Sequence, residues 1–169
     1  SPPRFVVEPG EQMPFERWPI HGIIAQLGLA SPALLPRPAA FFYAAYHAVE
    51  QWLLGLLGSS ASNLYRTTTL QQRLFPTDCG HSGDAFWAVR NALQVALAVT
   101  PRECSTFLVH PKTWTLGTDD FYTKLVWRAL SEARQVLQEE SIRAALTPDA
   151  DQLHMISAYL DALHCCHQA

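Results

Sequence analysis

The sequence predicts an all-α fold: an irregular bundle of six or seven helices, preceded by a proline-rich extended arm. After residue 18, apolar residues recur at helical spacing, and many of these runs begin at a proline or an acidic residue and stop near a glycine or a proline. Eight of the twelve prolines fall within residues 1–38. We therefore expect an arm over residues 1–18, packed on the domain, and a single helical domain over residues 19–169.

The expected arm combines helix-breaking residues with apolar ones. Proline removes a backbone donor and fixes φ, so residues 1–18 are unsuited to a long helix or a central strand. The alternative, a proline-rich ligand for another protein, lacks a P-x-x-P run with flanking basic residues. Apolar side chains spread along the arm would anchor it to the domain; they are Phe5, Val6, Val7, Phe15 and Trp18.

Proline and glycine mark the first two helices. Pro19 suits the first position of a helix, and Gly28 suits its C-terminal stop. Pro38 opens the next helix and Gly58 closes it. This second helix is apolar on most of its faces, which is typical of a helix in the middle of a bundle.

Residues 39–57 of the second helix form a segment long enough to be a candidate membrane span. His47, Glu50 and Gln51 lie together at their middle, where a charge in lipid costs at least about 2.5–3.5 kcal/mol. The segment therefore predicts a buried core helix, and we expect no membrane span. His47 stands alone among apolar residues, and we expect a backbone carbonyl to satisfy it.

The middle of the chain predicts two helices separated by a loop. Residues 64–75 mix strand-favouring threonines and a tyrosine with leucines at helical spacing, and we expect a short helix there. Residues 76–83 form the clearest loop. We expect Ser82 or Asp84 to cap the next helix, which should end by Val99.

Thr100-Pro101-Arg102-Glu103 matches a capping box. In such a box the threonine hydroxyl accepts a hydrogen bond from the third helical amide, while the glutamate reaches back to the cap. Proline takes a position where no amide partner exists. The pattern predicts a short helix that His110-Pro111 ends.

Two helices are expected to close the chain. Thr118-Asp119-Asp120 opens a long one, because acids stabilise the positive end of the helix dipole. Its expected buried side is Phe121, Leu125, Ala129, Val136 and Leu137. Its expected solvent side is Glu132, Arg134, Glu139, Glu140 and Arg143. Thr147-Pro148-Asp149 starts the last helix, on which Leu153, Ile156, Leu160 and Leu163 align.

The composition excludes some functions. Of 169 residues, 49% are apolar and 16% are charged, with a formal net charge of −3. Soluble domains average about 25% charged residues, so either the core is large or part of the apolar surface contacts a partner. The arginines are scattered singly, so we expect no nucleic-acid partner. Four cysteines form no disulfide framework, and reduced thiols indicate an intracellular protein, cytoplasmic or nuclear.

Residues 76–84, PTDCGHSGD, are the best candidate for catalytic chemistry. A thiol at a helix N-terminus, here Cys79, can have a lowered pKa and act as a nucleophile. His81 is too close along the chain to form the usual nucleophile–base pair, and Asp84 would repel a bound anion. We therefore interpret the segment as a capped loop between helices whose glycines allow a turn.

A metal site is the second candidate, because His164-Cys165-Cys166-His167 lies near the end of the chain. Zinc prefers four nitrogen or sulfur ligands, usually from two spaced pairs, whereas adjacent cysteines on a helix point about 100° apart. We expect no metal and no cofactor. If a metal were bound, its ligands would be Cys79, His81, His164 and His167.

These observations lead to a non-catalytic interaction or scaffolding module that binds a protein partner within a larger intracellular assembly. Aromatic residues in loop-like segments are the candidate contacts, because tryptophan is frequent at interface hot spots; they are Phe15, Trp18 and Trp114. A homo-oligomeric structural subunit is the first alternative. A thiol-dependent enzyme that uses Cys79 and His81 is the second.

Overall fold

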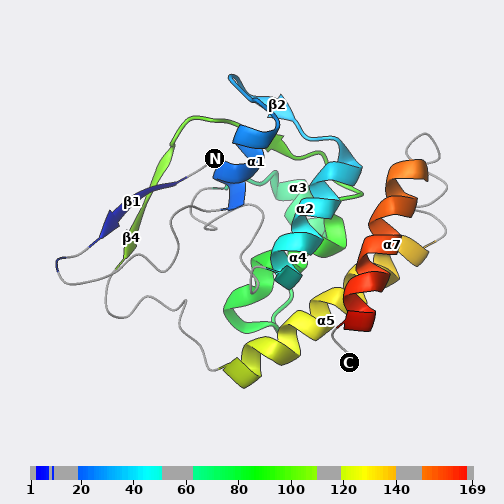
Figure 1. Cartoon of the computed structure of the whole chain (residues 1–169). Coiled ribbons are helices and arrows are strands. Elements are labelled where there is room, and N and C mark those ends of the chain that lie inside the picture. The colour runs from blue at the N-terminus through cyan, green and yellow to red at the C-terminus, as the bar shows by residue number, and fades with distance from the viewer. Residues whose placement is uncertain are drawn as a thin grey trace.

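The computed structural model describes residues 3–7, 9, 19–50, 63–109, 119–139 and 150–166. This part of the chain is predominantly helical, as predicted, with six α-helices (Figure 1). It also contains two small two-stranded sheets, which an all-α fold does not include. The fold is therefore helical in its core with short strands attached.

The six helices begin close to the predicted positions. The Gly28 residue has a φ of 60°, which ends the first helix as expected because glycine tolerates this conformation. The helices are α1 (Pro19–Gln26), α2 (Arg37–Glu50), α3 (Thr67–Gln72), α4 (Gly83–Asn91), α5 (Asp119–Gln138) and α7 (Ala150–Cys166), and the 3-10 turn η2 covers Gly80–Ser82.

The core surrounds α2, which packs against α4, α5 and α7 (Figure 1). Phe41 is fully buried, and small residues beside it let neighbouring helices approach closely. These small residues are Ala40, Ala44, Ala45 and Ala48. A helix is present where the central one was predicted, and its predicted end at Gly58 lies outside the described residues. No helix in the described ranges is long and apolar enough to cross a membrane.

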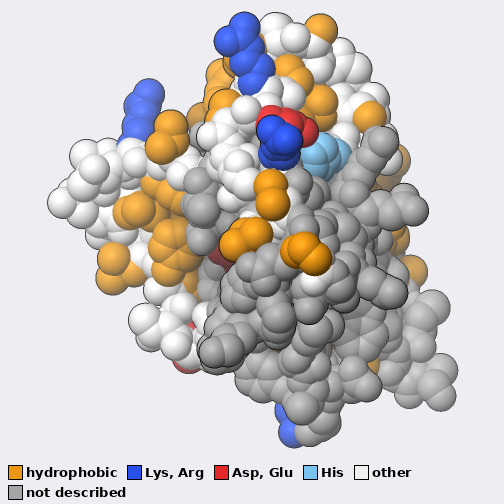
Figure 2. Space-filling model, turned by 90° about the vertical axis from the view of Figure 1, so that its left-hand side faces the viewer, with side chains coloured by type: hydrophobic (Ala, Val, Ile, Leu, Met, Phe, Trp, Pro, Cys, Tyr) orange, Lys and Arg blue, Asp and Glu red, His pale blue; other side chains and the backbone are white. Residues whose placement is uncertain are grey.

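The strands join segments far apart in the sequence. β1 (Pro3–Val7) pairs in parallel with β4 (Ser105–Val109), and β2 (Ala33–Leu34) pairs antiparallel with β3 (Ala98–Val99). Residues 3–7 of the expected arm are thus extended, whereas residues 10–18 lie outside the described residues. Figure 2 faces the side of β1 and β4, where basic side chains stand apart from one another among hydrophobic ones.

The predicted helix after Thr100 is wrong. The Thr100 hydroxyl accepts a hydrogen bond from the Arg102 amide at 3.3 Å, two residues along, which is a local turn rather than a helix cap. The residues that follow form β4, because pairing with β1 satisfies their backbone groups. The preceding helix, α4, also ends earlier than predicted, at Asn91 rather than near Val99.

Candidate functional site

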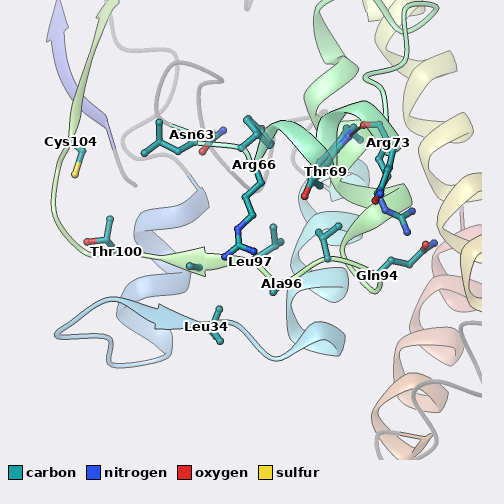
Figure 3. Close-up of a pocket in the computed structure, with 16 residues that line it drawn as sticks. Leu34, Asn63, Arg66, Thr69, Arg73, Gln94, Ala96, Leu97, Thr100 and Cys104 are labelled. Atoms are coloured by element: carbon teal, nitrogen blue, oxygen red, sulfur yellow. Dashed lines mark hydrogen bonds between the residues drawn. The ribbon is translucent and has the colours of Figure 1, made fainter.

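A groove of about 820 Å³ lies between the chain that leads into α3 and the chain that follows α4 (Figure 3). Residues 63–73 form one wall and residues 94–104 form the other, with contributions from β2 and α4. Its lining residues are Leu34, Asn63, Leu64, Tyr65, Arg66, Thr69, Gln72, Arg73, Trp87, Gln94, Val95, Ala96, Leu97, Ala98, Thr100 and Cys104.

Aromatic packing and three hydrogen bonds hold one wall of the groove. The ring centroids of Tyr65, Phe75 and Trp87 lie 5.3–5.6 Å from one another. The Trp87 Nε1 donates to the Arg73 carbonyl at 2.7 Å. The Arg73 Nη1 donates to Asn91 Oδ1 at 3.1 Å, and Asn91 Nδ2 donates to the Trp87 carbonyl at 2.8 Å. This wall is therefore fixed to α4.

Among the described residues, the groove lining contains two arginines and no carboxylate. Arg73 is engaged with Asn91, as described above. Arg66 is exposed, and its guanidinium extends from its wall toward Leu97 on the opposite wall (Figure 3). Within the described ranges, no carboxylate pairs with Arg66. An uncompensated cation thus lies in the groove.

Two large aliphatic side chains on the groove are exposed. Leu64 is fully exposed, at 103%, and Leu34 is 69% exposed. Both line the groove, on different segments of the chain. Exposed apolar side chains grouped at one concave surface are typical of a contact region for another molecule.

The strand β3 contributes an edge to the same groove. The Leu35 amide donates to the Leu97 carbonyl at 2.8 Å, and Leu34 stands opposite Ala98 in the antiparallel ladder. Since backbone groups alternate in direction along a strand, the amide and carbonyl of Ala98 point away from β2. In Figure 3, β3 lies between β2 and the Arg66 side chain. Within the described ranges no strand pairs with this outer side of β3, so the exposed Ala98 presents a strand edge to the groove.

The loop over residues 76–84 is organised as a turn, as predicted. Gly80 has a φ of 55°, which favours glycine. Ser82 makes no capping hydrogen bond; instead Asp84 Oδ1 accepts one from the Ala85 amide at 2.8 Å in the first turn of α4. A Cβ added to Gly83 would lie 3.0 Å from the Pro76 carbonyl oxygen, so close packing also favours glycine there.

Four charged side chains close this loop against α4 and α5. Glu132 accepts two hydrogen bonds from Arg90, at 2.7 and 2.8 Å, and one from Arg128 at 3.0 Å. Arg128 also donates to Asp78 at 2.6 Å, which lowers the pKa of that carboxyl. Both guanidinium groups lie over the ring of Phe86, 5.3 and 6.0 Å from its centroid. The two positive charges are balanced by two negative ones, so this cluster fastens elements together.

Cys79 lies fully buried beside this cluster. Burial raises the pKa of its thiol; the Arg128 guanidinium opposes that shift, and the Asp78 carboxylate adds to it. A raised pKa reduces the thiolate fraction, which is the reactive form. The side chain of His81, its suggested partner, lies outside the described residues.

We expect the Cys79 thiol to react with a maleimide at least about tenfold more slowly than those of Cys104 and Cys165, because the latter two are exposed. Peptide mass mapping after timed labelling of the folded protein measures each site separately. Labelling in unfolding concentrations of urea is the control and should remove the difference. If Cys79 reacts first in the folded protein, a buried and unreactive thiol is contradicted.

The residues suggested as metal ligands do not form a cluster in the described ranges. No group of three or more histidine, cysteine, aspartate or glutamate side chains suited to a metal occurs there. The ring of His164 instead contacts Trp127 edge-on, with centroids 5.8 Å apart. His167 lies outside the described residues, as do the candidate contacts Phe15, Trp18 and Trp114.

His47 differs from expectation. Its side chain is 8% exposed, and its Nδ1 has no hydrogen-bond partner in the part of the chain that the structure describes. The rings of Tyr43 and Tyr46 lie against it, with centroids at 6.3 and 5.1 Å. Burial lowers its pKa to about 4. At Nδ1 the predicted carbonyl contact is therefore not found within the described ranges, and aromatic rings pack against the imidazole.

A smaller hollow of about 380 Å³ lies between α2 and α7. It contains no charged side chain and is lined by Pro38, Ala39, Phe42, Tyr43, Gln152, Met155, Ile156 and Tyr159. Unlike the groove shown in Figure 3, it offers neither a cation nor a strand edge. The larger groove therefore has more means to select a partner.

No pattern in the sequence marks the groove. Leu34, Arg66 and Ala98 occur in segments without a motif, and only folding brings them together. The two exposed leucines, Leu34 and Leu64, would look like ordinary core residues in a sequence. No family model, curated protein or solved structure matches this chain.

Proposed function

We propose that this chain is a non-catalytic interaction module that binds an extended peptide segment of a protein partner in the groove of Figure 3. The observation that carries the proposal is the combination, in one groove, of two exposed leucines and a strand edge at Ala98 that no strand of the described ranges pairs with. An added strand obtains affinity from main-chain hydrogen bonds and specificity from side-chain contacts.

The leucines lie where they can contribute to such binding. Leu34 comes from β2, next to the strand that carries Ala98, and Leu64 comes from the opposite wall. Because both leucines line the groove, a peptide bound in it would cover part of each side chain. Complete burial of one leucine contributes about 1.5–3 kcal/mol, enough to change affinity by roughly tenfold or more.

We expect the double variant Leu34→Ser/Leu64→Ser to weaken peptide binding by at least about tenfold. The probes are twelve-residue peptides selected on the protein from a random display library, then labelled with a fluorophore. Fluorescence anisotropy titrations on the original chain and its variants measure the dissociation constants. Since both leucines are exposed, the variant should retain its thermal unfolding midpoint.

Leu74→Ser is the matched control. Leu74 is 78% exposed but does not line the groove, so its replacement should leave peptide affinity unchanged. Failure to select any peptide, or selected peptides that bind the double variant as well as the original chain, would overturn the proposal. Equal weakening by the control would also contradict it, since that would indicate general adhesion to apolar surface.

A further inference from the structure

We infer that the partner segment bound in this groove is acidic, and that the guanidinium of Arg66 binds a carboxylate of that segment. This inference rests on the proposed function and adds the chemistry of the partner. Its basis is the charge distribution of the groove, which contains Arg66 and Arg73 and no acidic residue among its sixteen lining residues.

The two arginines have different roles. Arg73 is held by Asn91, and its backbone carbonyl accepts the Trp87 hydrogen bond, so it belongs to the wall. Arg66 has no carboxylate partner within the described ranges, although other arginines of the chain do. Its guanidinium crosses toward Leu97 rather than lying along its own segment (Figure 3). Because no carboxylate of the described ranges pairs with it, the Arg66 guanidinium is available to a ligand.

Uncharged hydrogen-bonding side chains accompany Arg66 in the groove. They include Thr69 and Thr100, whose hydroxyl groups can donate to a carboxylate (Figure 3). Arginine binds carboxylates through paired, charge-assisted hydrogen bonds, which are stronger and more directional than neutral ones. With Ala98 supplying main-chain groups, a strand that carries an acidic side chain matches the groove in both hydrogen bonding and charge.

The charge is positive but small, and this favours a peptide over a nucleic acid. Nucleic-acid sites neutralise several phosphates with clustered basic residues. This groove has one unpaired arginine beside exposed leucines, in a chain of net charge −3. A single carboxylate flanked by apolar side chains is the better chemical match.

The test uses the library peptides that depend on Leu34 and Leu64, so that groove binding is established first. Each is synthesised with its aspartates and glutamates, and again with asparagine and glutamine in their place. Anisotropy titrations compare the original chain with Arg66→Glu and with Arg4→Glu. Arg4 is an exposed arginine of β1 that does not line the groove.

We expect Arg66→Glu to weaken the binding of the acidic peptides at least about tenfold and to change the binding of the amide versions less than about twofold. Arg4→Glu should change neither by more than about twofold.

Peptides that bind in the groove without an acidic residue, or with no dependence on Arg66, would overturn this inference and leave the proposed function intact. The absence of any leucine-dependent peptide overturns both. The inference would also be overturned, in favour of a nucleic-acid ligand, if a twelve-nucleotide oligothymidylate bound more tightly than the acidic peptides and its binding depended on Arg66.

Discussion

Replacing Glu132 with glutamine is expected to lower the free energy of unfolding by about 2–3 kcal/mol. The Glu132 carboxylate is 16% exposed and accepts hydrogen bonds from Arg90 and Arg128. Its loss leaves two guanidinium groups without their shared anion, and the glutamine amide would place a donor against them. Because each arginine is about one-third exposed, water relieves part of the cost.

Urea unfolding monitored by circular dichroism at pH 7 measures this effect. Glu139→Gln is the matched control, since Glu139 is exposed just after the same helix, and its replacement should change stability by less than about 0.5 kcal/mol. Equal unfolding midpoints for the original chain and Glu132→Gln would show that the ion pairs do not stabilise the fold. Burial would raise the pKa of Glu132, but the hydrogen bonds from both arginines lower it overall. Its contribution is therefore present at neutral pH and lost as pH falls through the lowered pKa.

Acidification from pH 7 to pH 5 is expected to lower stability by about 2 kcal/mol through His47 alone. Burial lowers the pKa of His47 to about 4 in the folded protein, compared with 6.5 for an unperturbed histidine. The unfolded state therefore binds a proton first as pH falls. The contribution of the neutral His47 ring to the free energy of unfolding is fully present above pH 6.5 and is lost progressively down to about pH 4.

The variant His47→Phe should remove this pH dependence, because its ring fills the space between Tyr43 and Tyr46 but cannot be protonated. Since Nδ1 has no hydrogen-bond partner in the described ranges, the replacement should cost little at pH 7. His154→Gln, at an exposed position of α7, is the control and should retain the slope. Urea midpoints between pH 7 and pH 5 test this; parallel curves for the original chain and His47→Phe would contradict it.

Local sequence patterns located most of the helices because the determinants of a helix lie within a few residues. Gly28 ended α1 through its own backbone freedom, and Asp119 stands at the predicted start of α5. The predicted helix at Thr100 failed for the complementary reason. Its capping pattern is local, but residues 105–109 obtain their hydrogen bonds from residues 3–7, about a hundred positions earlier.

Side-chain environments were predicted less well than helices. Glu132 belongs to the expected solvent side of α5, but Arg90 comes from 42 residues away and covers it. Its i,i+4 relation to Arg128 was visible in the sequence, whereas the approach of α4 was not. His47 Nδ1 likewise has no carbonyl partner in the described ranges, and aromatic rings of its own helix pack against the imidazole.

The sequence by itself determined the helical class, the starts of the principal helices and the burial of α2, because periodicity and capping act over single turns. Only the tertiary structure decided which charges meet and where a groove forms. Leu34, Arg66 and Ala98 come from three separate segments, and none has a local pattern that marks it. Their proximity follows from how β2, β3 and α3 pack on the core, which depends on contacts between residues distant along the chain.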